Sequence, residues 1–366
     1  MYFLPFLAFL LIINIMSERR THKIVFPIVG NVIITYNSIW LKRKSRRKIM
    51  PELNHLKKFV DCFVSFNRIL GMINENKMEP EVKKRYKFKL HGWIGIFLIS
   101  IAEFAVIFQH RSYIAHRVGV WTTPLCWWGY IFLIDAIIFR LKGNSLICNR
   151  RRNFLLQLPL SIIIWLLFEL YNLHLVNWKY IGLPTNPVEL CLGMGLAFAT
   201  IMPGMFLTAE LLDTLRVFDR FHIAKLKVNN RIIYGGIILG FFFIMAPLLL
   251  PESSAKYLFG LVWTGFVMLF EPIVYSSRGD SLLGDLENGT LRRILSLFAA
   301  GFICGFFWEF WNFWAPSKWV YTAPFMQDLK IFEMPVAGFL GFGPFAWEYF
   351  VMYNFARLLL RREGGK

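Results

Sequence analysis

Two acidic residues in apolar surroundings are the strongest candidates for chemistry in this chain. Glu309 lies within the aromatic run 306–313, and Glu169 lies in a similarly apolar stretch. Each is followed three residues later by an asparagine, Asn312 or Asn172, and residues i and i+3 share one face of a helix. An ionisable side chain is costly in hydrocarbon, so one within a membrane span usually faces protein or water. The two Glu-x-x-Asn pairs therefore form the candidate polar centre.

Aromatic residues gather around both pairs and define the chemistry that we expect. A buried carboxylic acid can protonate a substrate, and aromatic faces can stabilise a developing carbocation. The expected substrate-binding residues are the two asparagines and the neighbouring aromatics, namely Asn172, Asn312, Trp308, Trp311, Trp178, Trp319, Tyr180 and Tyr321. Acidic residues in such aromatic spans resemble the small polytopic terpene and carotenoid cyclases, which implies an enzyme acting on a lipid or isoprenoid. The resemblance covers a few residues around Trp308 and Glu309, includes no diagnostic motif and assigns no family.

Glu348 is the third candidate for an acid or base, together with Glu309 and Glu169. It follows the run 338–344, which contains three glycines and Pro344. A helix interrupted in this way leaves backbone groups that only protein or a cavity can satisfy at membrane depth. We therefore expect this span to form a cavity wall that Glu348 lines. Glu103, in the middle of another apolar window, is a weaker candidate of the same kind.

A structural interpretation of the same residues stays open beside the functional one. Each glutamate could bond a neighbouring helix near the membrane interface, and the aromatic residues that follow could form an interfacial belt. Asp135 and Glu271 lie near the ends of their spans, with Arg140 and Arg278 within two turns, so a structural ion pair or an end charge that snorkels to the interface is the simpler expectation for them.

An internal repeat is the most informative pattern in the chain. Residues 127–145 match 263–281 at a constant offset of 136, and residues 168–184 match 308–324 at offsets of 140 to 141. The second match pairs Glu169 with Glu309, and farther on Pro203 aligns with Pro344. Because each repeat would hold four spans, we expect the two copies to have the same orientation and to be related by a pseudo-two-fold axis along the membrane normal.

Composition indicates what surrounds these elements. The chain has 366 residues, 56% hydrophobic and only 17% charged, whereas soluble domains carry about 25% charged residues. Apolar windows of spanning length, about 17 to 25 residues, recur at 93–109, 120–139, 154–171, 188–208, 232–250, 257–275, 294–314 and 334–355. A further apolar segment, 1–16, is expected to be a retained span, and 24–36 to lie in the interface or re-enter. The predicted fold is an all-α polytopic membrane protein.

The basic residues set the expected orientation. Alternate segments between the eight windows hold 32 Lys and Arg on one side and 6 on the other, so the rich segments should be cytoplasmic. The predicted organisation comprises six parts: an N-terminal membrane anchor (1–36), a basic cytoplasmic region (37–92), repeat one (93–208), a cytoplasmic linker (209–231), repeat two (232–355) and a basic cytoplasmic tail (356–366). The basic 37–92 region is expected to contact anionic lipid headgroups of a cell or inner membrane. It shows no nucleic-acid-binding motif, and no nucleic-acid partner is expected.

Several classes of site find no support in the sequence. The five cysteines form no C-x-x-C pair, and no phosphate-binding loop, dinucleotide fingerprint or serine-hydrolase elbow is present. His110, His116 and His174 could join Glu169 at a metal only with spacings that match no common pattern, so no metal site is expected and no cofactor is indicated. Two alternatives to a lipid-modifying enzyme remain, a proton-coupled transporter of a small molecule and a non-catalytic scaffold.

Overall fold

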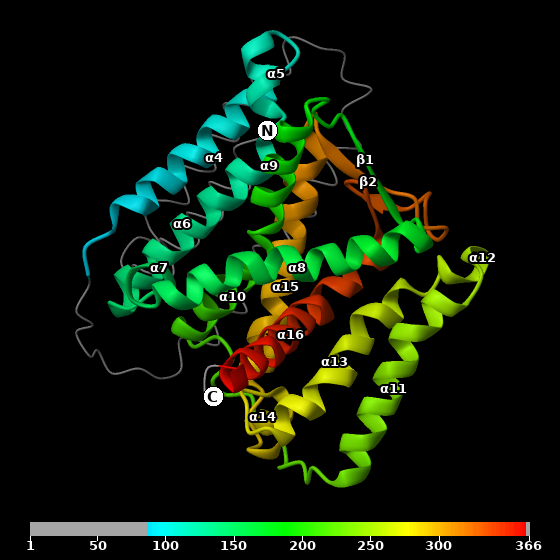
Figure 1. Ribbon diagram of the computed structural model, residues 1–366. Coiled ribbons are helices and arrows are strands. Elements are labelled where there is room, and N and C mark those ends of the chain that lie inside the picture. The colour runs from blue at the N-terminus through cyan, green and yellow to red at the C-terminus, as the bar shows by residue number, and fades with distance from the viewer. Residues whose placement is uncertain (1–85, 364–366) are drawn as a thin grey trace. The chain divides into compact units, whose positions relative to one another are not determined.

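The computed structural model describes residues 86–363, which form one body of packed helices (Figure 1). The predicted anchor at 1–36 and most of the basic region 37–92 lie outside these residues. Within the described part, seven helices are long and apolar enough to cross a membrane. The chain is therefore a predominantly helical, multi-pass integral membrane protein.

The first half of the body contains four of these spans. Its elements are α4 (Leu90–Phe108), α5 (Tyr113–Gly119), α6 (Thr122–Lys142), α7 (Leu146–Asn149), α8 (Arg151–Leu175), β1 (Trp178–Ile181), α9 (Pro187–Phe198) and α10 (Ile201–Thr214). Helices α9 and α10 follow each other as one span of 28 residues. The Asn186 side chain caps α9 by accepting hydrogen bonds from the backbone N–H groups of Val188 and Glu189, and Pro187 occupies the first helical position.

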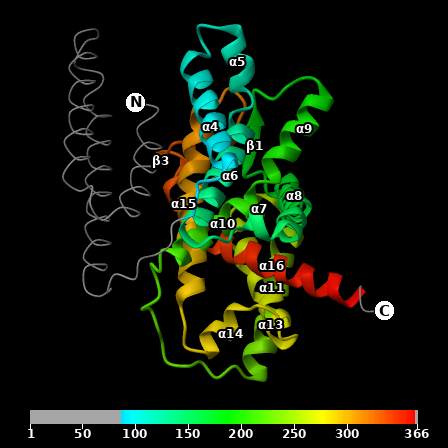
Figure 2. The ribbon, with the colours of Figure 1, turned by 90° about the vertical axis from the view of Figure 1, so that its left-hand side faces the viewer.

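The second half also alternates long helices with short ones and ends with short strands, a 3-10 helix and a last long helix. Its elements are α11 (Asn230–Leu249), α12 (Glu252–Ala255), α13 (Phe259–Ser276), α14 (Leu282–Glu287), α15 (Arg292–Trp314), β2 (Lys318–Tyr321), β3 (Lys330–Ile331), β4 (Met334–Pro335), the 3-10 helix η1 (Val336–Gly341) and α16 (Phe342–Glu363). Figures 1 and 2 place α5 toward one end of the long helices and α14 toward the other.

Glycines bring the first two spans of each half into close contact. A Cβ on Gly95 of α4 would lie 2.4 Å from the Gly129 carbonyl oxygen of α6, and a Cβ on Gly240 of α11 would lie 2.8 Å from the Gly265 carbonyl oxygen of α13. Small residues allow helix backbones to approach in this way within a membrane. The pairs α4–α6 and α11–α13 thus pack through corresponding glycines.

The expected eighth span, 334–355, is wrong in its bounds. Strand β4 and η1 occupy 334–341, and the continuous helix α16 begins only at Phe342. Proline and three glycines explain the late start, because they disfavour a regular helix through this stretch. The first half has a related break, since α10 begins at Ile201, 141 residues before Phe342. With Trp347, Glu348, Asn354 and Arg357 in its length, α16 is more polar than the seven spans.

Two short antiparallel sheets qualify the all-α prediction. Strand β1 pairs with β2 so that Trp178 faces Tyr321 and Tyr180 faces Trp319, while β3 pairs with β4. Figure 1 shows β1 and β2 side by side, next to the ends of α8 and α15. The pair β1–β2, called the ribbon below, joins the two halves of the chain.

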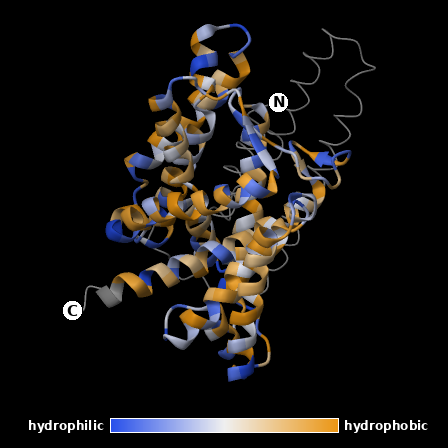
Figure 3. Ribbon diagram, turned by 45° about the vertical axis from the view of Figure 1, so that its right-hand side comes forward, coloured by the Kyte–Doolittle hydropathy of each residue, from blue (hydrophilic) through white to orange (hydrophobic). Residues whose placement is uncertain are grey.

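The helices consist largely of apolar residues, as Figure 3 shows, and many of these residues are exposed. Helix α11 is the clearest case, because Ile238, Phe241, Phe242 and Leu249 are all exposed on it. Such a surface is suited to contact with lipid tails. The most deeply buried large side chains, by contrast, lie mainly on α6, α8, α10 and α16 and include Trp127, Tyr130, Phe168 and Tyr349.

Candidate functional site

The two asparagines of the Glu-x-x-Asn pairs fasten the ribbon to the helices. Asn312 donates from Nδ2 to the Trp319 carbonyl oxygen (2.8 Å) and accepts from the Trp319 backbone N–H at Oδ1 (2.9 Å). Asn172 makes the same two bonds to the backbone of Trp178, at 2.9 and 3.2 Å. Each asparagine therefore fixes the strand that follows its helix, and neither lines the cavity described below.

Glu309 is fully buried beneath the ribbon. Its Oε1 accepts hydrogen bonds from the Tyr321 hydroxyl (2.8 Å) and from Nε1 of Trp319 (3.4 Å), both on β2. Among the described residues, no hydrogen-bond partner reaches its Oε2. Burial raises the pKa of the Tyr321 hydroxyl well above its ordinary value, so this group remains a donor at neutral pH.

Glu169 has the corresponding position in the first half but a different environment. It is only partly buried, and its Oε1 accepts from the Tyr180 hydroxyl (2.5 Å), from Trp178 (3.2 Å) and from Trp165 (2.8 Å). The Trp165 bond has no counterpart at Glu309. The two carboxyl groups thus share a tyrosine and a tryptophan from the ribbon but differ in burial and in the number of donors.

An apolar cavity of about 190 Å³ lies beneath the ribbon, between the two halves of the chain. The first half contributes Trp121, Trp165 and Met194, among others, and the second contributes Trp263, Phe342 and Phe345. Glu309 is one of its lining residues, and Glu169 is not. Among the described residues that line the cavity, Glu309 is thus the fully buried carboxyl group, and aromatic side chains surround it.

Six of the eleven predicted site residues line this cavity: Glu309, Trp308, Trp178, Trp319, Tyr180 and Tyr321. Trp311 points elsewhere and packs edge-on against Trp127, while its Nε1 lies 3.4 Å from Oε1 of Glu103. Glu103 is thus buried beside an indole and does not line the cavity.

The expected position of Glu348 on the cavity wall is wrong. Helix α16 lines the cavity with Phe342 and Phe345, and Glu348, almost one turn farther along, is fully buried away from it. Because α16 starts at Phe342, the face toward the cavity is set by the aromatic residues of its first turn. Within the described residues, neither carboxyl oxygen of Glu348 has a hydrogen-bond partner.

Two glycines on the Glu309 helix, α15, lie against the start of α16. A Cβ on Gly301 would lie 2.0 Å from the Phe342 carbonyl oxygen, and one on Gly305 would lie 2.2 Å from the Phe342 ring. Helix α15 therefore packs closely on the start of α16, and Glu309 and Asn312 face protein as expected. In the first half Ser161 has the place of Gly301, and its hydroxyl donates to the Phe198 carbonyl oxygen at the α9–α10 break (2.5 Å).

Two kinds of residue at this site were not predicted from the sequence. Trp165, Trp263 and Phe345 line the cavity but lie in spans that are aromatic throughout, so only the position of Trp165 four residues before Glu169 offered a signal. Ion pairs at the edge of the cavity were also missed. Lys318 lies 2.5 Å from Glu333 and Arg117 lies 2.9 Å from Glu189, and two of these four residues, Lys318 and Glu189, line the cavity.

The expected ion pairs of Asp135 and Glu271 with arginines are wrong. Asp135 accepts at Oδ1 from the Ile147 backbone N–H (2.8 Å) and contacts Ser145 and His91 through Oδ2. Glu271 accepts from the Leu283 backbone N–H (2.7 Å). Each carboxylate thus bonds the first turn of a short helix, α7 or α14, where free N–H groups favour an anion.

His174 and Glu169, considered above as joint metal ligands, each bond other groups. His174 contacts the Leu250 carbonyl oxygen through Nε2 at 2.9 Å, and Glu169 is bonded to the ribbon and Trp165. Among the described residues, the group with metal-ligand geometry consists of His91, Asp135 and Cys148 instead.

Comparison of the chain with protein-family models, with curated proteins and with solved structures found no significant match.

Proposed function

We propose that this protein is an intramembrane enzyme that modifies a lipid or isoprenoid, with Glu309 as its general acid. One observation carries the proposal: Glu309 is fully buried, lines the aromatic cavity, and has one carboxyl oxygen held by Tyr321 and Trp319 while the other is unpartnered among the described residues. Held through one oxygen, the carboxyl group can present the other to a substrate.

The step proposed is protonation of a carbon–carbon double bond. The electron pair of the double bond forms a new C–H bond with the carboxyl proton, and a carbocation and the Glu309 carboxylate result. The faces of Trp308, Trp319 and Trp263 around the cavity are suited to stabilise that cation. Loss of a proton from a neighbouring carbon, to the carboxylate or to water, completes an isomerisation or cyclisation without any oxidant or reductant.

The size of the cavity indicates which part of the substrate it holds. Its volume of about 190 Å³ is only somewhat larger than the roughly 150 Å³ apolar cavity that holds a benzene molecule. One ring or the end of a prenyl chain would fill it. The rest of a long substrate would then extend past the ribbon or between the helices into the lipid.

The inequivalence of the two carboxyl groups favours an enzyme over a symmetric carrier. Glu309 lines the cavity, whereas Glu169 lies behind Tyr180 and Trp165 and is bonded to both. One reaction centre needs one acid. Glu169 and Glu348 are proposed as supporting groups, which could hold or move a proton but do not touch the cavity.

We also propose that the body consists of two tandem four-helix repeats, 93–208 and 232–355, in the same orientation. Corresponding asparagines fasten corresponding strands, and corresponding glycines join the first two spans of each half. The ribbon pairs Trp178 with Tyr321 and Tyr180 with Trp319, the exchange that a two-fold relation requires. The cavity then lies at the interface between the repeats.

The charge distribution supports a cytoplasmic location for the 209–231 linker and for the 356–366 tail. On this proposal the ribbon and the cavity beneath it lie near the opposite face of a cell or inner membrane. The basic 37–92 region would contact anionic headgroups on the cytoplasmic side.

The experiment compares organic extracts from cells that express the native chain, the Glu309→Gln variant or an empty vector. Lipids and isoprenoids are scored by mass and by chromatographic retention, because an isomerisation leaves mass unchanged. We expect a species that appears with the native chain and is absent with Glu309→Gln at equal protein levels. Glu252→Gln, an exposed change on α12, is the matched control and should retain the species.

Identical extracts from all cells, with the precursor pool present, would contradict the enzyme proposal. Proton-coupled uptake by the native chain, lost in Glu309→Gln, would then favour the transporter. A scaffold predicts neither a new species nor uptake.

A further inference from the structure

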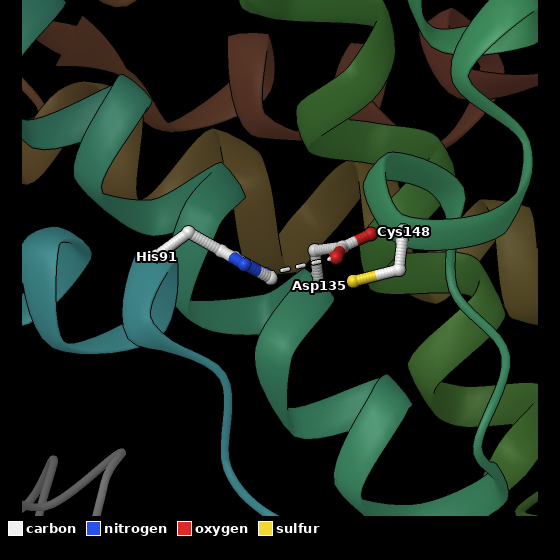
Figure 4. A group of neighbouring side chains, drawn as sticks. All are labelled: His91, Asp135 and Cys148. Atoms are coloured by element: carbon white, nitrogen blue, oxygen red, sulfur yellow. Dashed lines mark hydrogen bonds and ion pairs between the residues drawn. The ribbon is translucent and has the colours of Figure 1, made fainter.

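The structure assigns a second site, made of residues that do not line the cavity, to a transition-metal ion of the zinc type. Three potential ligands meet where α4, α6 and α7 come together: His91, Asp135 and Cys148 (Figure 4). One ligand atom from each lies within 4.8 Å of the other two. This inference does not depend on the proposed enzyme activity.

The ligand set selects the class of metal. A thiolate, an imidazole and a carboxylate are common zinc ligands, and three protein ligands leave a fourth position for water. The soft sulfur of Cys148 disfavours magnesium and calcium, which prefer oxygen ligands. The charges of one thiolate and one carboxylate together balance a divalent cation.

Asp135 is held in place by groups outside the set of ligands. The Ser145 hydroxyl donates to its Oδ2 (2.8 Å), and the Ile147 backbone N–H donates to its Oδ1 (2.8 Å). His91 already lies 3.0 Å from the same carboxylate through Nε2. Hydrogen bonds of this kind orient a metal ligand before the metal arrives.

Two nearby positive charges share a carboxylate outside the set of ligands. Lys142 and Arg150, which flank the short helix α7 that carries Cys148, both contact Glu210 of α10, at 2.7 and 2.5 Å. The Glu210 carboxylate therefore offsets one of these two positive charges, which reduces the repulsion that a bound cation would experience.

The second half of the chain has a similar helix cap but lacks the histidine and the cysteine. There Glu271 bonds the first turn of α14 as Asp135 bonds the first turn of α7. At the offset of 136 residues, Gly284 corresponds to Cys148. Gly95 of α4 and Gly240 of α11 make equivalent contacts, with Gly129 and Gly265. His91, four residues before Gly95, therefore corresponds to Gly236, four residues before Gly240. The capping arrangement thus occurs without a histidine or a cysteine, so capping does not explain their presence in the first half.

The test measures metal in the full chain, purified in detergent without chelators. We expect about one zinc per chain by elemental analysis. Cobalt(II) added to the metal-free chain should give a thiolate-to-cobalt charge-transfer band in the near-ultraviolet. Cys148→Ser should abolish this band, and Cys191→Ser, which changes an exposed cysteine on α9, should retain it.

Two further variants keep the result decisive. His91→Gln changes a partly exposed residue and should lower zinc content even if Cys148→Ser accumulates poorly. Ser145→Ala, which removes the bond that orients Asp135, should weaken cobalt binding about 10- to 100-fold. The proposal is overturned if the native chain holds no more zinc than His91→Gln, or if the cobalt band survives in Cys148→Ser.

Discussion

The hydroxyl of Tyr321 donates a 2.8 Å hydrogen bond to Oε1 of Glu309, from a strand to a helix that precedes it in the chain. Tyr180 bonds Glu169 in the same manner in the first half. Because β1 and β2 pair with each other, one ribbon holds both tyrosines above both carboxyl groups. The ribbon is therefore part of the site and not merely a connection between spans.

Loss of the Tyr321 hydroxyl should destabilise the protein more than loss of the Tyr180 hydroxyl. In Tyr321→Phe a fully buried carboxyl group loses a donor, at a cost of about 1–3 kcal/mol. Glu169 is partly exposed and keeps donors from Trp165 and Trp178, so Tyr180→Phe should cost less. Thermal unfolding in detergent, followed by tryptophan fluorescence, measures the difference. Equal midpoints for the two variants would show that the burial of Glu309 has no energetic effect.

Asn312→Ala should destabilise the chain because it leaves the Trp319 backbone N–H and carbonyl without their partner. Each such group costs about 1–3 kcal/mol when buried. A thermal midpoint for Asn312→Ala equal to that of the native chain would contradict this account of the asparagine.

The Glu-x-x-Asn pattern shows how much of the site could be predicted from sequence. Its spacing placed Glu309 and Asn312 on one helix face, and both are buried there. The asparagine was expected to bind substrate, yet it binds the backbone of Trp319, because the partner strand comes from a later segment whose pairing no local pattern encodes. Trp311 was assigned to the site for its nearness to Glu309 in sequence, but helix geometry turns it toward Trp127.

Helices were predicted correctly where a long segment is uniformly apolar. The prediction failed where proline and glycine residues interrupt an apolar segment. The windows that became α4 to α15 are uniformly apolar, and each forms one helix or, at 188–208, the two consecutive helices α9 and α10. The window 334–355 is also apolar, but Pro335 and the glycines before Pro344 give a strand and a 3-10 helix before α16 begins. That shift determines which α16 residues face the cavity, and it is why Glu348 was misplaced.

Gly301→Ala should disrupt the packing of α15 on α16. The added Cβ would lie 2.0 Å from the Phe342 carbonyl oxygen, so the two helices must separate, at a cost of about 1–3 kcal/mol. Gly260→Ala is the matched control, because a Cβ there has no atom within 4 Å and alanine favours the helix. A thermal midpoint for Gly301→Ala equal to that of Gly260→Ala would contradict close packing at this contact.

Filling the cavity should abolish activity without unfolding the protein. Gly193 lines the cavity, and a Cβ added there meets no atom within 4 Å. Gly193→Phe should therefore project a ring into the substrate space, whereas Gly260→Phe adds the same ring at an exposed position on α13. Product formation should be lost only in Gly193→Phe, with similar thermal midpoints for both. Full activity of Gly193→Phe would place the substrate elsewhere.

The ribbon tyrosines predict a pH dependence at the alkaline end. Burial raises the pKa of Tyr180 and of Tyr321 above their ordinary value, and hence above their value in the unfolded chain. Each then adds stability that is fully present below the unfolded pKa of about 10 and is lost as pH rises through the folded pKa. Stability should therefore fall above about pH 10, and less steeply in the double variant Tyr180→Phe/Tyr321→Phe. Parallel curves for the two proteins would argue against buried ribbon tyrosines.

The most direct test of Glu309 as the general acid traces the transferred proton into the product. Membranes that contain the native chain are incubated in deuterium oxide with the precursor lipids, and the new species is analysed by mass spectrometry. If Glu309 protonates a carbon–carbon double bond, the product should carry one solvent-derived deuterium on carbon, and Glu309→Gln should form none. A product formed without deuterium, or formed equally by Glu309→Gln, would contradict the account.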